Sequence, residues 1–268
     1  MEAEKQLING PVLIHSDIFL THHLIIKRTK NLSNACNILD NHLDYLSDLF
    51  GIENLSFPTF NYDFPKDKLF SIDETPSQVG ALSNHVIGNK NLFTRTDTPI
   101  FSFCVGQNFD LSYGNKPFGN NSLFSFLHEN DGSIVFYGTQ INSCTFLHFV
   151  ESQFGPPRYR YDKQFKGTLK KDKIKTDTDV VFHVRPFGMN LDYDWNFLLK
   201  LLKKYRAIIN LDKNVFIAKV RDISKIWGEQ ITNDDLSILS KDCRKDIKDK
   251  LNLLDRRFLI KDFEEIKQ

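Results

Sequence analysis

Near the start of the chain, a short apolar run at residues 11–14 ends in the polar triplet His15, Ser16 and Asp17. This pattern is typical of a buried strand that delivers polar side chains to one edge of a sheet. Apolar residues then recur at helical spacing over residues 34–50, and Gly51 stands where such a helix would end. Residues 55–60 again have the character of a strand. Strand, helix and strand in this order indicate an α/β fold.

The same alternation continues along the chain. We expect strands at residues 100–106, 134–138 and 180–184, and helices at 77–86, 122–127, 142–151 and 195–205. The polar segment 61–76 is predicted to be a surface loop, and the charged segment 236–266 to be helical and to coat the surface. No repeat, low-complexity tract or linker is visible. The sequence thus predicts a single domain over residues 1–268, with a mixed β-sheet flanked by helices.

The charge balance restricts the partners. The chain of 268 residues has 35 Lys plus Arg against 34 Asp plus Glu, a net charge of +1, so it lacks the field expected of a nucleic-acid-binding protein. No run of 18 apolar residues is present, and residues 1–9 are charged rather than a signal peptide, so we expect a cytoplasmic protein without a membrane span. The four cysteines form no CxxC pair, which favours reduced thiols.

Several enzyme classes are excluded because their motifs are missing. The sequence contains no GxxxxGK[ST], no GxGxxG, no HExxH and no GxSxG. P-loop nucleotide-binding enzymes, Rossmann dehydrogenases, zinc proteases of this type and serine hydrolases are therefore disfavoured.

One pair of residues can build a general base. His148 and Glu151 are three residues apart in a predicted helix and would share one face, where a carboxylate could hold the imidazole in the tautomer that accepts a proton. A packed or capping histidine is the alternative. Cys144, four residues before His148, could be a thiol nucleophile, but that spacing on one helix seldom gives the required approach. A metal cluster lacks ligand spacing among the candidate histidines, which are His15, His22, His23, His128 and His148.

An ordered series of segments resembles the aminoglycoside 3-N-acetyltransferase family, whose members are acyl-CoA-dependent N-acyltransferases. The series is IHSDI at 14–18, PTF at 58–60, GALS at 80–83, RTDTPIFSF at 95–103, PFGNNSL at 117–123 and TxxHxxE at 145–151. The resemblance covers residues 10–155, and its order along the chain makes it specific. It implies that the single domain is an acyltransferase domain.

The resemblance implies roles for particular residues. The histidine of the TxxHxxE segment, here His148, is implied to be the general base for the acceptor amine, and an acidic residue is implied to orient it. Asp192 is favoured for this second role, with Asp194 and Glu151 as competitors. Acetyl-CoA is implied as the acyl donor and no metal is required. Regions that line the CoA channel correspond to Ser16, Arg95, Thr96, Ser102 and Phe103. Arg95 could meet a CoA phosphate or be only a surface charge.

Two departures from the family pattern concern the substrates. Thr98 replaces the histidine of the usual Arg-Ser-x-His-Pro segment, and residues 14–17 replace a Val-His-Ser-Ser run. A balanced charge also suits a polycationic antibiotic poorly. We therefore expect the acceptor to be the amine of an amino sugar, nucleotide-linked and used in surface-glycan biosynthesis. The alternatives are an aminoglycoside 3-N-acetyltransferase that confers antibiotic resistance, and a non-catalytic binding module. A homodimer is left open.

Overall fold

The computed structural model describes residues 10–26, 35–154 and 156–264. The charged segment 1–9 and the side chain of Cys36 lie outside the described residues, so the predictions made for them are not addressed. The other three cysteines are free thiols and buried. Within the described ranges, no helix is both long and apolar enough to cross a membrane.

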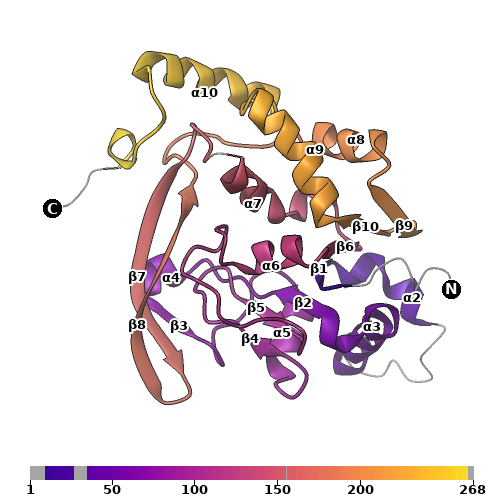
Figure 1. Ribbon diagram of the computed structural model, residues 1–268. Helices are drawn as coiled ribbons and strands as arrows, with labels where there is room; N and C mark the ends of the chain where they lie inside the picture. Colours follow the sequence, from indigo (N-terminus) through magenta and orange to yellow (C-terminus); the bar gives the residue numbers. More distant parts are fainter. Residues whose placement is uncertain (1–9, 27–34, 155, 265–268) are drawn as a thin grey trace.

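A seven-stranded mixed sheet forms the centre of the fold (Figure 1). Its order is β4-β5-β2-β1-β6-β10-β9, in which β1 is parallel to β2 and β6 and the other pairs are antiparallel. The strands are β1 (Val12–Ser16), β2 (Leu55–Pro58), β4 (Thr94–Arg95), β5 (Phe103–Val105), β6 (Ser133–Tyr137), β9 (Ile208–Asp212) and β10 (Val215–Lys219).

Helices cover both faces of this sheet, as the sequence predicts. Alternation along β1 sends Val12 and Ile14 into one core and Leu13 into the other. One face carries α3 (Ala35–Phe50) and α5 (Ala81–Gly88), and the other carries α6 (Leu123–Glu129), α7 (Phe146–Gln153) and α9 (Val220–Asn233) (Figure 1). Three further helices are α2 (His22–Ile26), α8 (Trp195–Lys204) and α10 (Lys241–Leu254).

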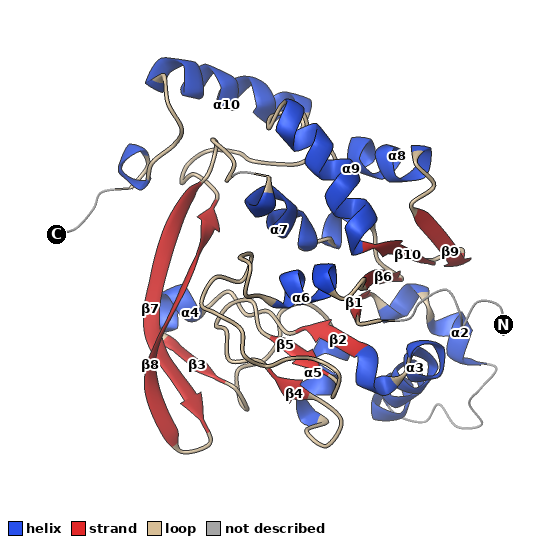
Figure 2. Ribbon diagram, viewed as in Figure 1, coloured by secondary structure: helices blue, strands red, loops and turns tan. Residues whose placement is uncertain are grey.

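A second sheet of three strands stands beside the main one. Its order is β3-β7-β8, with β3 (Leu69–Ser71), β7 (Tyr161–Lys171) and β8 (Ile174–Val184). Strands β7 and β8 pair over their whole length as one long curved hairpin, and the short helix α4 (Phe64–Asp67) packs against it (Figure 2). The base of the hairpin, where β7 begins and β8 ends, faces α7 and contributes to the site described below.

Several predicted boundaries are wrong. Segment 61–76 is not only a loop, because buried Phe64 and Phe70 anchor α4 and β3 within it. The helix expected from residue 142 begins at Phe146, after a 3-10 turn at Ile141–Ser143. The C-terminal segment has one long helix, α10, which buries an apolar stripe rather than only coating the surface.

Candidate active site

Helix α7 carries the two residues of the TxxHxxE segment. Its apolar side chains Phe146, Leu147, Phe149 and Val150 are all buried in the larger core, which fixes the helix rigidly against α9. The side chain of His148 keeps 25% of its surface exposed, whereas Glu151 is fully buried. A charged carboxylate in that position needs strong compensation from its neighbours.

Glu151 holds His148 in a defined tautomer. Nδ1 of His148 lies 2.9 Å from Oε2 of Glu151. Because an ionised carboxylate only accepts hydrogen bonds, Nδ1 must carry the hydrogen, and the lone pair is left on Nε2. Nε2 makes no hydrogen bond to any residue of the described ranges. His148 therefore has one nitrogen anchored and the other available as a proton acceptor.

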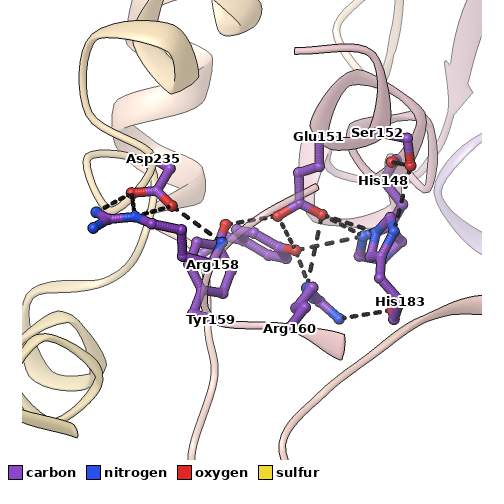
Figure 3. Close-up of polar contacts among 9 residues, drawn as sticks. His148, Glu151, Ser152, Arg158, Tyr159, Arg160, His183 and Asp235 are labelled. Carbon is purple, nitrogen blue, oxygen red and sulfur yellow. Dashed lines mark hydrogen bonds and ion pairs between the residues drawn. The ribbon is translucent and has the colours of Figure 1, made fainter. Parts of the chain in front are cut away.

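The second oxygen of Glu151 is also occupied. The hydroxyl groups of Tyr159 and Tyr193 donate to Oε1 over 2.7 and 2.8 Å. On the Oε2 side, Nε of Arg160 lies 3.8 Å away and Nε2 of His183 lies 3.4 Å away. Figure 3 shows His148, Tyr159, Arg160 and His183 around the carboxylate of Glu151. Together with Tyr193, these groups come from α7, the base of the β7–β8 hairpin and the segment before α8.

The electrostatics of this cluster favour an ionised Glu151 and a neutral His148. Burial opposes ionisation of Glu151, but the Arg160 guanidinium and the hydrogen bonds from His148 and His183 outweigh it and hold its pKa well below the usual value. Burial lowers the pKa of His148 to about 4, against a smaller opposing effect of Glu151. At neutral pH His148 is thus an unprotonated imidazole that can accept a proton.

A cavity of about 280 Å³ adjoins His148. Its polar lining consists of His148, Arg160, His183 and Arg185, and most of the rest is aromatic or aliphatic, including Phe101, Phe118 and Phe182. A smaller cavity of about 160 Å³ shares Phe118, Phe182 and His183 with the first and is lined in addition by Lys116, Ser152 and Asp162. An amine held in the larger cavity would meet His148.

The cluster also resembles a metal site in outline. Ligand atoms of His148, Glu151 and His183 all lie within 4.8 Å of one another. However, Arg160 is 3% exposed and already supplies a positive charge next to Glu151. A divalent ion placed there would be repelled by that guanidinium and would compete with the hydrogen bond that orients His148. The donor set therefore suits an oriented base better than a metal centre.

The carboxylate favoured from the sequence does not reach His148. Asp192 is exposed, and its Oδ1 accepts the backbone N–H of Tyr193. Asp194 caps α8 by accepting the N–H of Phe197. The residue between them, Tyr193, is the one that turns inward to Glu151. The expected role of Asp192 is thus a wrong assignment, and the competing residue Glu151 is the carboxylate that contacts the imidazole.

The residues expected to line a CoA channel are mostly internal. Arg95 is 8% exposed and donates to the carbonyl oxygens of Thr59, Ile72 and Thr75 and to two hydroxyl groups, so four of its five N–H groups are already used. The Oγ of Ser102 donates to the Thr59 carbonyl, and the Oγ1 of Thr96 accepts the N–H of Phe103.

Phe103 itself lies in the core, and only Ser16, at the end of β1, is partly exposed. A direct contact of Arg95 with a phosphate is incompatible with this hydrogen-bonding arrangement.

Cys144 does not have the features of a nucleophile. It is 2% exposed, and burial raises the pKa of its thiol to about 12. A reactive cysteine needs an accessible thiolate, which this environment opposes.

Sequence reasoning missed four members of the cluster, namely Tyr159, Arg160, His183 and Tyr193. His183 was detectable in principle, since it is a lone imidazole in an otherwise apolar strand end. The others had no signal because they are brought to Glu151 from different segments only by the tertiary fold.

Comparison with known proteins now identifies the family. The family model described as aminoglycoside 3-N-acetyltransferase matches residues 45–194, which is more than half of the chain. The chain belongs to this family. Membership confirms the resemblance drawn from the sequence and makes the protein an N-acetyltransferase. A search among curated proteins gave no match.

Solved structures confirm the fold. The apoenzyme of aminoglycoside acetyltransferase AAC(3)-IVa is 19% identical, with a TM-score of 0.61 over 85% of this chain and 83% of that one. AAC-IIIb, crystallised with CoASH, is 13% identical, with a TM-score of 0.64 over 87% and 93%. YokD from Bacillus subtilis is 12% identical, with a TM-score of 0.59 over 85% and 88%. A histidine-to-alanine variant of AAC(3)-IVa has been crystallised with a gentamicin.

Proposed function

We propose that this acetyltransferase moves an acetyl group from acetyl-CoA to the amine of an amino sugar, with His148 as the general base. The observation that carries the proposal is the arrangement of the imidazole, since Nδ1 is fixed by Glu151 and the free Nε2 belongs to a residue that lines a cavity. The CoA complex of the structurally similar AAC-IIIb supports acetyl-CoA as the donor.

The reaction would be a direct transfer. Nε2 of His148 takes a proton from the acceptor amine while the amine nitrogen attacks the thioester carbonyl. The new C–N bond forms, the C–S bond breaks, and the CoA thiolate receives the proton from the imidazolium. Glu151 stabilises the imidazolium and keeps its ring oriented without taking the proton. The products are the N-acetylated sugar and free CoA.

The acceptor is proposed to be nucleotide-linked, as in surface-glycan biosynthesis. Two observations about charge support it. The whole chain has a net charge of only +1, and none of the residues that line the cavity beside His148 is a carboxylate. A polycationic acceptor gains from acidic side chains that neutralise its ammonium groups, and this cavity offers arginine and histidine instead.

A second candidate function is acetylation of an aminoglycoside. It is favoured by family membership and by the gentamicin complex of the AAC(3)-IVa variant. A non-catalytic binding module is less well supported, because such a module has no need of a buried ionised carboxylate that holds a histidine.

Turnover with a panel of amines tests the proposal. Release of CoA thiol would be measured with acetyl-CoA and nucleotide-linked amino sugars, and in parallel with kanamycin and gentamicin at matched concentrations. We expect the higher kcat/KM for a nucleotide-linked amino sugar and loss of that turnover in His148→Ala. A higher kcat/KM for an aminoglycoside would select the second candidate, and no turnover with any amine would favour the binding module.

A further inference from the structure

Two arginines line the cavity beside His148, and they differ in what they contact. Arg160 is buried, and its guanidinium lies near Glu151 and donates to the hydroxyl group of Tyr193 over 2.6 Å. Its charge is compensated within the cluster. Arg185 is exposed and makes no hydrogen bond or ion pair with any residue of the described ranges. Arg185 is therefore the one lining residue whose positive charge has no counterion in the described structure.

The backbone holds Arg185 at this position. It directly follows Val184, the last residue of β8, which pairs with Tyr161 of β7. It directly precedes Pro186, which is buried and restricts the preceding residue to an extended conformation. The side chain thus starts from a fixed point at the end of a strand, which lowers the entropy lost when it binds a ligand.

No carboxylate of the lining competes for this guanidinium. Asp63 adjoins the lining residue Tyr62 in sequence, but it does not line the cavity, and its Oδ2 accepts the side-chain amide of Gln78 over 2.6 Å. Asp162 lines the smaller cavity and not the larger one. A free arginine in a mostly apolar cavity wall is well suited to bind a phosphate or carboxylate through two parallel hydrogen bonds.

The size of the cavity limits where that anion can be on the substrate. A volume of about 280 Å³ is on the scale of one sugar ring with a substituent. His148 and Arg185 line this same volume. The phosphates of acetyl-CoA are separated from its thioester by the whole pantetheine arm, which is longer than the cavity. An anion at Arg185 would thus belong to the acceptor.

We propose that Arg185 forms an anion subsite in the cavity beside His148, which binds a phosphate or carboxylate on the same sugar unit as the acceptor amine. This inference rests on the proposed acetyl transfer and adds the position of the charge on the acceptor. The anion fixes the sugar at Arg185, and the amine of the same sugar unit then lies at Nε2 of His148.

The test compares two acceptors that differ only in charge, glucosamine 1-phosphate and glucosamine. In Arg185→Gln we expect KM for glucosamine 1-phosphate to rise about 10- to 100-fold, the usual effect of losing a charge-assisted pair. KM for glucosamine and for acetyl-CoA should stay within about twofold, and Arg185→Lys should restore part of the loss. Arg257→Gln is the matched control, because Arg257 is also exposed and lines none of the cavities described above.

Three results would overturn the subsite. These are an unchanged KM for glucosamine 1-phosphate, an equal rise in KM for both sugars, and a rise in KM for acetyl-CoA alone. The last result would mean that Arg185 binds the acyl donor. If the wild-type enzyme acetylates neither these two sugars nor any nucleotide-linked amino sugar, the proposed function fails by itself. Calorimetric titration with glucosamine 1-phosphate then tests the subsite directly. We expect weaker binding to Arg185→Gln than to the wild-type protein, and equal binding to the two would show that the subsite proposal is wrong.

Discussion

Two buried arginines, Arg95 and Arg160, have their positive charges stabilised by different kinds of group. Arg95 is surrounded by neutral oxygens, since it donates to three backbone carbonyls and two hydroxyl groups and lies over the ring of Phe70. Arg160 instead faces the carboxylate of Glu151, to which His148 is bonded. The hydrogen bonds of Arg95 join loops and offer no binding site for a ligand. The contacts of Arg160 stabilise a charge that orients a base beside a cavity.

A structural arginine and one that supports chemistry can be told apart by the groups that they contact. Burial alone does not distinguish them, as the two side chains are both almost inaccessible. The contact partner does distinguish them. An ionised carboxylate acts on the pKa of a neighbouring titratable group through its full charge, which a neutral carbonyl oxygen lacks. The following experiments test whether the two clusters differ in function as they differ in partners.

The largest effect is expected for His148→Ala. Turnover should fall about 100- to 10,000-fold, the usual contribution of a positioned general base, while acetyl-CoA binding changes little. Steady-state kinetics and calorimetric titration with CoA would measure the two effects. Near-normal turnover would mean that the cluster around Arg160 is as purely structural as the one around Arg95.

Glu151→Gln tests the carboxylate itself. The change keeps the shape but leaves Arg160 buried without a counterion, so the free energy of unfolding should fall by about 3 to 5 kcal/mol. Turnover of the folded fraction should also drop, because the imidazole loses the partner that fixes its tautomer.

Asp192→Asn is the matched control for Glu151→Gln, since Asp192 is exposed and its carboxylate bonds only the adjacent backbone. Urea unfolding and kinetics should show changes within about 0.5 kcal/mol and twofold for this variant. A larger loss of turnover in Asp192→Asn than in Glu151→Gln would restore the assignment that the sequence favoured.

Arg95→Met should affect stability and not chemistry. Removing the guanidinium leaves several buried acceptors unpaired, and we expect a loss of about 2 to 4 kcal/mol in unfolding free energy. At a temperature where the variant is folded, KM for acetyl-CoA should stay within about twofold of the wild-type value. A tenfold rise in that KM would show that Arg95 binds the donor, as the family resemblance implied.

Among the effects expected within the two arginine clusters, the pH dependence of stability is the smallest, and it again separates the two clusters. Burial holds the pKa of His148 at about 4, below the ordinary value of 6.5, so the unfolded chain binds the extra proton between these values. The contribution of His148 to the free energy of unfolding is fully present above pH 6.5. It decreases as the pH falls toward 4, by about 1 to 2 kcal/mol at pH 5.

Unfolding free energies at pH 7 and pH 5 measure this contribution. The difference between the unfolding free energies at pH 7 and pH 5 should be smaller by about 1 to 2 kcal/mol in His148→Asn than in the wild-type protein. In Arg95→Met it should keep its wild-type size, because no histidine or carboxylate bonds Arg95. An unchanged difference in His148→Asn would indicate that His148 titrates alike in the folded and unfolded states.

Those parts of the fold that depend on local pattern can be predicted from the amino-acid sequence alone. The apolar run before His15 and the spacing of residues 34–50 predicted β1 and α3 closely, because periodicity acts within a few residues. The pair His148 and Glu151 was predicted for the same reason, since three residues on one helix bring two side chains together in any fold.

The surroundings of that pair depend on contacts between segments that are distant in the sequence. Tyr159, Arg160, His183 and Tyr193 come from the base of a hairpin and from the segment before α8, and nothing local predicts that these reach one carboxylate. The same applies to Arg95, whose sequence context is compatible with a surface charge or a phosphate ligand until its carbonyl partners are known. Burial and long-range contacts set the charge state and role of a polar side chain, and both are properties of the packed molecule.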